Sequence, residues 1–173
     1  MRIIVLGATG MAGTAVVNEA LSRGHEVTAV SRRRHRAGAG VTSCLLDVTD
    51  VGSVAGLLKD SDAAVVALRP PAGHESDLVR LTEAVLDAAS LSRTPLLIIG
   101  GAAPLSSPSD PGTLAIDDPT IVPPAWKDVA QASLDQFRAC QAHGYEGWVY
   151  LSPPAIFGPG DVTGSYRRGT TTL

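Results

Sequence analysis

The chain has 173 residues, of which 45% are hydrophobic, so it is long enough for one well-filled domain and short for two. Its formal net charge of -3 disfavours a nucleic-acid or anionic-membrane binder, since such proteins usually carry a basic excess. A membrane span needs about 18 apolar residues, and no apolar run in the sequence is nearly that long. The apolar run at the N-terminus is too short for the core of a signal peptide. Cys44 and Cys140 read as buried thiols in a reducing compartment. We therefore expect a cytoplasmic protein.

In the first half of the chain, short apolar runs alternate with helical patterns. Residues 3–6 form a continuous aliphatic run, which is typical of a strand buried on both faces of a parallel sheet. The spacing of apolar residues then predicts a helix over 11–21, with Gly24 where a C-cap would stand. The pattern further predicts strands at 26–30 and 41–46, a short helix at 51–58 and a fourth strand at 62–68.

The second half continues the alternation. An amphipathic helix is predicted over 76–91, a strand over 95–100, a helix over 126–140 closed by Gly144, and a last strand over 148–152. The proline-rich segment 101–124 is long enough to suggest a lid or binding loop. The order predicts an α/β fold, a doubly wound Rossmann-like parallel sheet with helices on both faces, as one domain over residues 1–173.

Three glycines at three-residue spacing, Gly7, Gly10 and Gly13, follow the first strand and open the first helix. A pyrophosphate needs backbone N–H groups and a helix N-terminus close to it, with no Cβ in the way. The residues predicted to form this phosphate-binding turn are Gly7, Thr9, Gly10, Met11 and Ala12. The alternative is that the glycines serve only a tight strand-to-helix turn.

The sequence "GATGMAG" in this position resembles the short-chain dehydrogenase/reductase superfamily, in its extended and atypical branches. It looks most like the small atypical reductases of the biliverdin reductase B and flavin reductase type, and the NmrA-like NAD(P)-binding proteins. The segment "LSPPAIFGPGDVTGSYRRG", residues 151–169, carries this closer match through its paired prolines and T-G-x-Y pattern. Proteins of this kind continue beyond the segment that matches. We therefore expect that the chain is either a fragment or a shortened protein, and that it lacks the C-terminal part of the substrate site.

The end of the second strand indicates the cofactor. Rossmann proteins that bind NAD place an acidic residue there to hold the ribose 2′-hydroxyl, whereas Ser31, Arg32 and Arg33 stand here. Guanidinium groups can hold a 2′-phosphate bidentately, so NADP (NADPH) is favoured over NAD. The alternative is a solvated basic loop, which also includes Arg34 and Arg36.

The resemblance implies further cofactor contacts. It places Asp47 and Val48 beside the adenine, although Asp47 also suits a helix N-terminal acid, a role open to Asp50 as well. It places further contacts along the carboxyl edge of the sheet, at Ala67, Leu68, Arg69, Gly100, Gly101, Ser152, Pro153, Pro154 and Ala155. Ser152 can bond the nicotinamide carboxamide or only the local backbone.

The catalytic motif of the superfamily is absent. A Tyr-x-x-x-Lys pair would stand on the helix before the last strand, but Pro123 lies four residues before Lys127. Lys127 is either a ribose-binding remnant or an ordinary first-turn lysine. Some flavin and biliverdin reductases carry a histidine where Ala155 stands. No catalytic residue is assigned.

The histidines indicate no metal site. His74 lies in a loop and either faces the cleft or is solvated, while His25, His35 and His143 show no ligand spacing.

These patterns favour an NADPH-dependent reductase that passes hydride directly to a flavin, quinone or similar planar acceptor, because such acceptors need no strong protein acid. The alternative is a non-catalytic NADP(H)-binding redox sensor, and a sugar-nucleotide epimerase-like protein comes third. We expect a small-molecule acceptor, no nucleic-acid or membrane partner, and a monomer or homodimer.

Overall fold

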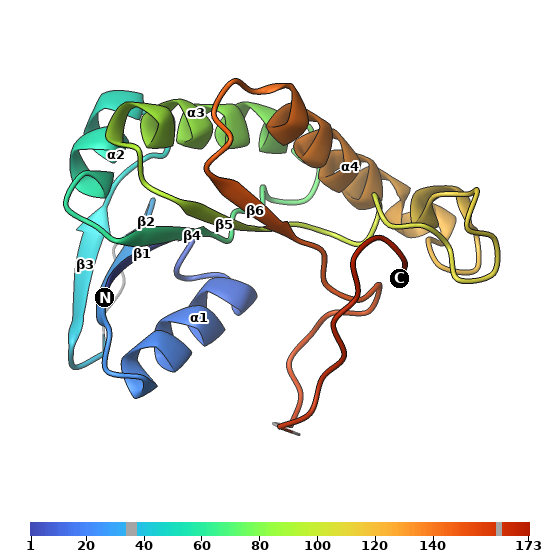
Figure 1. The fold of residues 1–173 in the computed structure, drawn as a ribbon, viewed down its shortest axis with the longest axis horizontal. Coiled ribbons are helices and arrows are strands. Elements are labelled where there is room, and N and C mark those ends of the chain that lie inside the picture. Colours follow the sequence, from blue (N-terminus) through green and yellow to red (C-terminus); the bar gives the residue numbers. More distant parts are fainter. Residues whose placement is uncertain (34–37, 162–163) are drawn as a thin grey trace.

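The computed structural model of the protein describes residues 1–33, 38–161 and 164–173. Arg34, His35 and Arg36 of the predicted basic loop, and Thr163 of the T-G-x-Y pattern, lie outside these ranges. Six parallel strands form one sheet in the order β3-β2-β1-β4-β5-β6. Helices flank both faces of this sheet (Figure 1), which confirms the predicted doubly wound α/β fold.

Each predicted strand and helix is present, with ends that differ by no more than two residues. The elements are β1 (Arg2–Leu6), α1 (Met11–Ser22), β2 (Glu26–Ser31), β3 (Val41–Leu45), α2 (Val51–Leu58), β4 (Ala63–Val66), α3 (Asp77–Ser92), β5 (Leu96–Ile99), α4 (Lys127–Ala142) and β6 (Trp148–Leu151). The long loop also holds two 3-10 helices that the sequence did not predict, η1 (Ala115–Asp117) and η2 (Pro124–Trp126).

The helix ends agree only in part with the prediction. Gly24 follows α1 with a φ of +75°, as expected of a residue just beyond a C-cap. Gly144 also stands just beyond a C-cap, that of α4, but it lacks a positive φ, and the extended backbone of the C-cap His143 ends the helix before it. Arg93 ends α3 in the left-handed conformation, with a φ of 58°, where the sequence carries no glycine to signal it.

The two faces of the sheet are covered unequally. The helices α2, α3 and α4 lie on one face and α1 lies on the other (Figure 1). Strand residues alternate, so Leu6, Val66 and Ile98 point into the larger core beneath the three helices. Val5 and Val27 pack under α1 with Val17, in a smaller core.

The face of the sheet that carries α1 is also apolar at β5 and β6, away from α1. The register pairs Leu97 with Val149 and Ile99 with Leu151, so these four side chains form two adjacent rows on that face. Val149 is 63% exposed and Leu151 48% exposed, and within the described residues α1 is the only helix on this side (Figure 1). Strand β5 is thus buried on one face and half-buried on the other, whereas β6 is half-buried on one face and exposed on the other.

The loop of residues 101–124 is held by internal hydrogen bonds and by packing on α4. It is therefore more constrained than the predicted lid. Ala103 and Ile116 pack on Leu134 of α4 in a third apolar cluster. The Asp118 carboxylate accepts hydrogen bonds from the buried Ser107 hydroxyl at 2.7 Å, from Ser109 and from Thr120. These bonds lower the Asp118 pKa to about 2, with the Thr120 hydroxyl as the largest cause. Ser106 also pairs with Leu114 and with Thr172 near the C-terminus.

We expect the two faces to respond differently to the same truncation. Val66→Ala, at a fully buried position, should lower the free energy of unfolding by about 2 kcal/mol through lost burial and a residual cavity. Val149→Ala removes the same atoms from an exposed position and should change the free energy of unfolding by about 0.5 kcal/mol or less. Urea denaturation with equal m-values measures both. Equal losses would show that something covers the β6 face in solution.

Asp118→Asn should loosen the long loop. The ionised carboxylate accepts these bonds more strongly than an amide does, so amide hydrogen exchange across residues 107–120 should speed up. Because the folded pKa lies below the ordinary 3.8, this stabilisation is present above pH 3.8 and is lost as the pH falls towards about 2. Asp60→Asn, at an exposed turn, is the control. Unchanged exchange in both variants would contradict the bracing role.

Candidate functional site

A cavity of about 200 Å³ lies at the carboxyl ends of β1, β2 and β4. In parallel α/β sheets this edge is where ligands bind. The structure brings together there many of the predicted site residues: Gly7, Thr9, Gly10, Ser31, Arg32, Val48, Ala67, Leu68 and Arg69. The lining also includes Val30, Leu46 and Leu81, which sequence reasoning missed. These residues are apolar, and an apolar residue in a predicted strand or helix indicates only that it is buried. The sequence therefore gave no sign that they line a cavity.

The glycine turn is held by backbone hydrogen bonds. The N–H groups of Gly7 and Ala8 both donate to the Val30 carbonyl, at 3.1 and 3.2 Å, which joins the turn to β2. Gly7 has a φ of +84°, a conformation that favours glycine. A Cβ there would also collide with the Ala67 carbonyl, and a Cβ on Gly13 would collide with the Gly7 carbonyl. The fold itself therefore requires Gly7 and Gly13.

Gly10 differs from its neighbours. A Cβ on Gly10 would lie 3.4 Å from the Gly7 carbonyl oxygen, a contact that a small shift relieves, and its φ is the ordinary −75°. Gly10 nevertheless lines the cavity and is the N-cap of α1, with no side-chain cap. The first-turn amides, including those of Met11 and Ala12, have no acceptor within the helix. A bare helix N-terminus beside a glycine can hold an anion, so the phosphate-binding role of this turn stays a prediction.

The end of β2 supplies the rim of the cavity. Ser31 is 7% exposed, and its hydroxyl donates to the Arg33 carbonyl at 2.7 Å, so this side chain shapes the local turn. Arg32 is exposed and lines the cavity, whereas Arg33 is exposed but does not line it. The cavity thus has a guanidinium group where an NAD protein would present an acid.

Asp47 lies just outside the cavity lining, next to Val48, which is 4% exposed and forms part of it. Its Oδ1 accepts bonds from the Thr49 N–H at 3.0 Å and the Thr49 hydroxyl at 2.8 Å. These two bonds, followed by the charges of Arg32 and Arg80, hold the Asp47 pKa below its ordinary value. Asp50, not Asp47, caps α2, by accepting from the Ser53 N–H at 3.1 Å.

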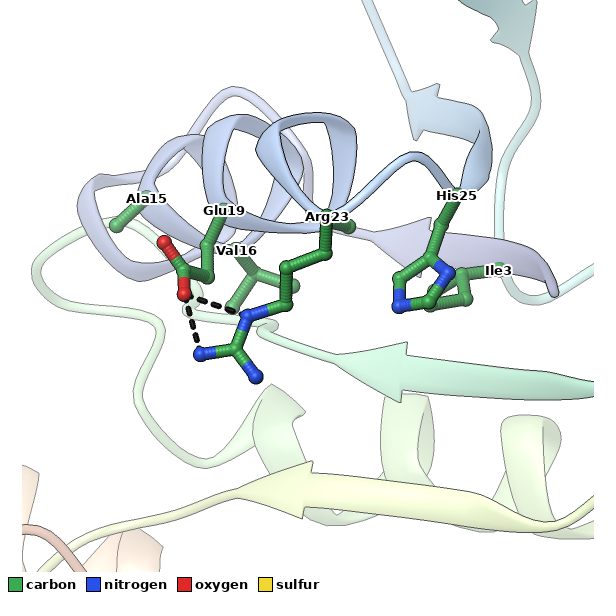
Figure 2. A pocket seen from close by; sticks show the side chains of 7 residues that line it. Ile3, Ala15, Val16, Glu19, Arg23 and His25 are labelled. Carbon is green, nitrogen blue, oxygen red and sulfur yellow. Dashed lines mark hydrogen bonds and ion pairs between the residues drawn. The ribbon is translucent and has the colours of Figure 1, made fainter.

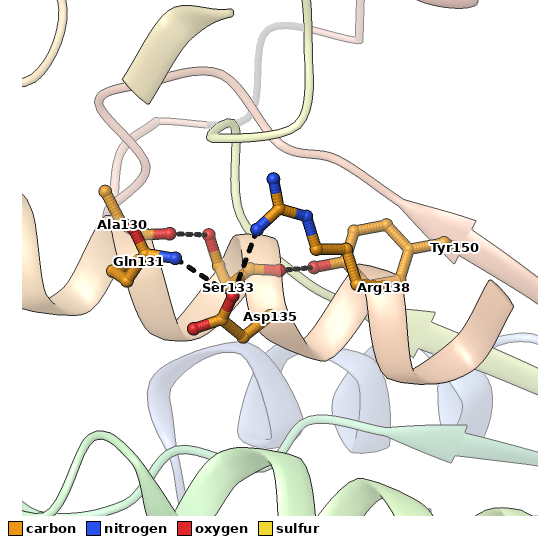
Figure 3. A network of polar contacts seen from close by, with 6 residues as sticks. All are labelled: Ala130, Gln131, Ser133, Asp135, Arg138 and Tyr150. Carbon is orange, nitrogen blue, oxygen red and sulfur yellow. Dashed lines mark hydrogen bonds and ion pairs between the residues drawn. The ribbon is translucent and has the colours of Figure 1, made fainter. Parts of the chain in front are cut away.

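The glycines after β5 accommodate a tyrosine. A Cβ on Gly100 would collide with the Tyr150 ring, and one on Gly101 would lie 2.6 Å from the Ser133 hydroxyl. The Tyr150 hydroxyl oxygen lies 2.9 Å from the Ser133 carbonyl, which ties β6 to α4 (Figure 3). It also lies 3.2 Å from Gln136 Oε1 of the same helix. Burial raises the Tyr150 pKa, so this phenol stays protonated. Packing alone therefore explains both glycines.

Several other predicted residues lie outside this cavity. Lys127 Nζ donates to the Ile116 carbonyl at 2.6 Å and lies 3.6 Å from Asp117 Oδ1, so the lysine braces the long loop. The lysine is thus not freely solvated, and its ribose contact stays a prediction, since the side chain is still 48% exposed. The remaining predicted residues that do not line the cavity are Met11, Ala12, Arg33, Asp47, Gly100, Gly101, Ser152, Pro153, Pro154 and Ala155. Within the described ranges, no tyrosine–lysine pair forms at the carboxyl edge.

A second, shallower groove of about 430 Å³ follows the flank of α1 (Figure 2). Its wall includes Ile3, Ala15, Val16 and the ion pair between Glu19 and Arg23, in which Nε lies 2.7 Å from Oε1. It contains none of the predicted site residues. The charges of Glu19 and Arg23 are already paired with each other, so the groove offers little to a charged ligand.

The remaining titratable groups add no second site. Over the described residues, no three His, Cys, Asp or Glu side chains gather as metal ligands. Cys140 is buried, and burial raises its pKa to about 11, which makes it an inert thiol. No helix in the described ranges is both long and apolar enough to cross a membrane.

The chain has characterised and uncharacterised relatives. The uncharacterized protein YwnB of Bacillus subtilis (strain 168) is 33% identical over 172 residues, which cover 98% of this chain and 79% of YwnB. A 3-diazoavenalumate denitrifying reductase from Streptomyces sp is 29% identical over 189 residues, which cover 100% of this chain. The match spans only 61% of that reductase, less than two thirds of its length.

Solved structures share the fold over most of the chain. A crystal structure named "putative exported protein" from Burkholderia pseudomallei has a TM-score of 0.87 at 33% identity, covering 100% of this chain and 82% of that one. SP1627 of Streptococcus pneumoniae TIGR4, named a "putative NADH-flavin reductase", has a TM-score of 0.78 at 27% identity. That match covers 95% of this chain and 77% of SP1627.

A family match spans the residues of the cavity as well as most of the fold. The NAD(P)H-binding family matches residues 7–172, which begin at the first glycine of the turn and include every residue that lines the cavity. The chain therefore belongs to the NAD(P)H-binding family, as the resemblance of its glycine turn predicted.

Proposed function

We propose that this protein is an NADPH-dependent reductase that transfers hydride directly to a planar acceptor of the flavin or quinone class. The observation that carries the proposal is the cavity at the carboxyl edge, which joins the glycine turn to Arg32 in one wall. A dinucleotide with a 2′-phosphate carries negative charge at both of these points. The uncapped helix N-terminus and the guanidinium group supply the matching positive charge.

The residues present fit this cofactor. The pyrophosphate would be held at Gly7 and Gly10, and Arg32 would hold the 2′-phosphate. Val48, Leu68 and Leu81 give the cavity an apolar wall suited to an adenine ring. We also propose that the Ser152–Ala155 segment, which follows β6 at the same edge of the sheet, borders the nicotinamide.

The proposed reaction does not need a strong acid from the protein. When bound, the cofactor supplies a hydride, that is, two electrons and a proton. A flavin or quinone takes up the hydride and then a proton from water, because its ring stabilises the reduced form. This matches a site in which the buried Tyr150 phenol is bonded to α4 and the Lys127 ammonium is bonded to the long loop. The contribution of the chain is to bind and orient the two partners.

The names of two similar proteins support the reaction class, since both are called reductases. SP1627 is named for NADH, so our preference for NADPH rests on Arg32 alone and needs its own test.

A redox sensor that binds NADP(H) without turnover remains a second candidate. It is favoured by the same commitment of Tyr150 and Lys127 to structural bonds. The two functions share every cofactor contact and differ only in whether an acceptor is reduced.

Calorimetric titration tests the cofactor. The wild-type protein should bind NADPH about tenfold more tightly than NADH, because charge-assisted bonds to a 2′-phosphate are worth roughly 1.5–3 kcal/mol. Arg32→Gln should remove most of this difference and leave NADH binding unchanged. Arg138→Gln, on the exposed side of α4, is the matched control and should bind as the wild type does. Tighter binding of NADH by the wild type would refute the NADPH assignment.

Steady-state assays with NADPH against a panel of flavins and quinones test the reaction. We expect turnover of at least one acceptor by the wild type. Gly10→Ala should keep a wild-type melting temperature within a few degrees, since its Cβ meets only a 3.4 Å contact, but should lose turnover because the Cβ enters the cavity wall. Tight NADPH binding with no turnover across the panel would support the sensor instead.

A further inference from the structure

A polar pair lies buried between two of the helices that cover the larger core. Helix α3 stands between α2 and α4 on that face of the sheet (Figure 1). The Gln136 side chain of α4 is 1% exposed, and its Nε2 donates to the Thr82 hydroxyl oxygen of α3 at 3.1 Å. Thr82 is equally buried, and its hydroxyl in turn donates to the Leu78 carbonyl at 2.8 Å. The pair thus joins α3 to α4 where water does not reach.

Stability alone does not require the Gln136–Thr82 pair. Burying an amide costs free energy, which its hydrogen bonds only offset. With leucine in place of Gln136, the Thr82 hydroxyl would keep its bond to the Leu78 carbonyl. The Tyr150 hydroxyl would likewise keep the Ser133 carbonyl at 2.9 Å. Because both neighbouring hydroxyls keep a partner, an apolar side chain of similar volume would fill this position with little loss of stability.

The pair does supply alignment. Apolar helix faces tolerate small shifts, whereas a buried hydrogen bond holds its two atoms to one distance and direction. Leu81, the residue before Thr82, lines the cavity together with Val48 and Leu68. A shift of α3 along α4 would therefore move one part of the apolar wall relative to the others. The bond between Gln136 and Thr82 opposes that shift.

A second polar contact joins the same two helices away from the cavity. Nε2 of His143, the C-cap of α4, lies 3.2 Å from Asp87 Oδ1 in the second half of α3. The Asp87 side chain is 61% exposed. An exposed contact of this kind contributes little and tolerates rearrangement, so it offers a matched comparison for the buried pair.

We infer that Gln136 is a positioning residue for the cofactor site, which through Thr82 fixes α3 and keeps Leu81 in place to contact an adenine ring. The inference rests on the proposed cofactor. It adds to the site a residue of α4 that does not itself line the cavity.

Calorimetric titration with 5′-ADP probes the adenosine end of the site directly. Gln136→Leu should keep a melting temperature within a few degrees of the wild type, because both neighbouring hydroxyls keep a partner. It should nevertheless weaken 5′-ADP binding roughly fivefold, since α3 is no longer held in register. Asp87→Ala, which breaks the exposed contact between the same helices, is the control and should bind 5′-ADP as the wild type does.

A second pair of variants separates alignment from stability. Thr82→Val leaves the buried Gln136 amide without its acceptor, so it should lower the melting temperature by about 4 °C and also weaken binding. The double variant Gln136→Leu/Thr82→Val removes the unpaired amide. Its melting temperature should return to that of Gln136→Leu, while 5′-ADP binding stays weak. Recovery of binding together with the melting temperature would show that the pair acts only through stability, and would overturn the inference.

The same titrations keep the inference apart from the proposed function. If the wild type binds 5′-ADP and NADPH, and Gln136→Leu binds both equally well, Gln136 has no positioning role and the cofactor proposal stands. If the wild type binds neither ligand, the proposed function fails, and the inference fails with it.

Discussion

The close approach of β1, α1 and β4 at the glycine turn is the constraint on which the site depends. Side chains at Gly7 and Gly13 would collide with the carbonyls of Ala67 and Gly7 respectively, so the turn closes only with glycine at these positions. The bonds from Gly7 and Ala8 to the Val30 carbonyl then fix the turn against β2. This places Gly10, the N-cap of α1, in the cavity wall, and in the proposed function the amides of the first turn hold the pyrophosphate there.

The charge of the side chains around this turn is opposite in sign to the net charge of the chain. The protein is acidic overall, yet two arginines line the cavity, Arg32 after β2 and Arg69 after β4. Elsewhere, several cations have protein partners: Arg23 and Arg138 are paired within helices, and Lys127 is bonded to the long loop. In the proposed function, the bonding of Lys127 and Tyr150 leaves the chain to bind and orient the partners rather than to act as an acid.

The remainder of the fold divides into a braced and an open part. Asp118 and the apolar cluster of Ala103, Ile116 and Leu134 hold the long loop against α4. On the α1 face, by contrast, Val149 and Leu151 remain exposed although their strand is apolar on both sides. A strand with two apolar faces is typical of burial on both.

Much of the fold could be read from residue order, because strand and helix periodicity and the glycine turn are local patterns. The same holds for Arg32, since the end of β2 is a fixed point of the dinucleotide pattern. The sequence could not show that Gly100 makes room for Tyr150, that Lys127 is bonded to Ile116, or that Leu81 lines the cavity. Each of these depends on contacts between segments distant in sequence, which no local spacing encodes and only the packed chain brings together.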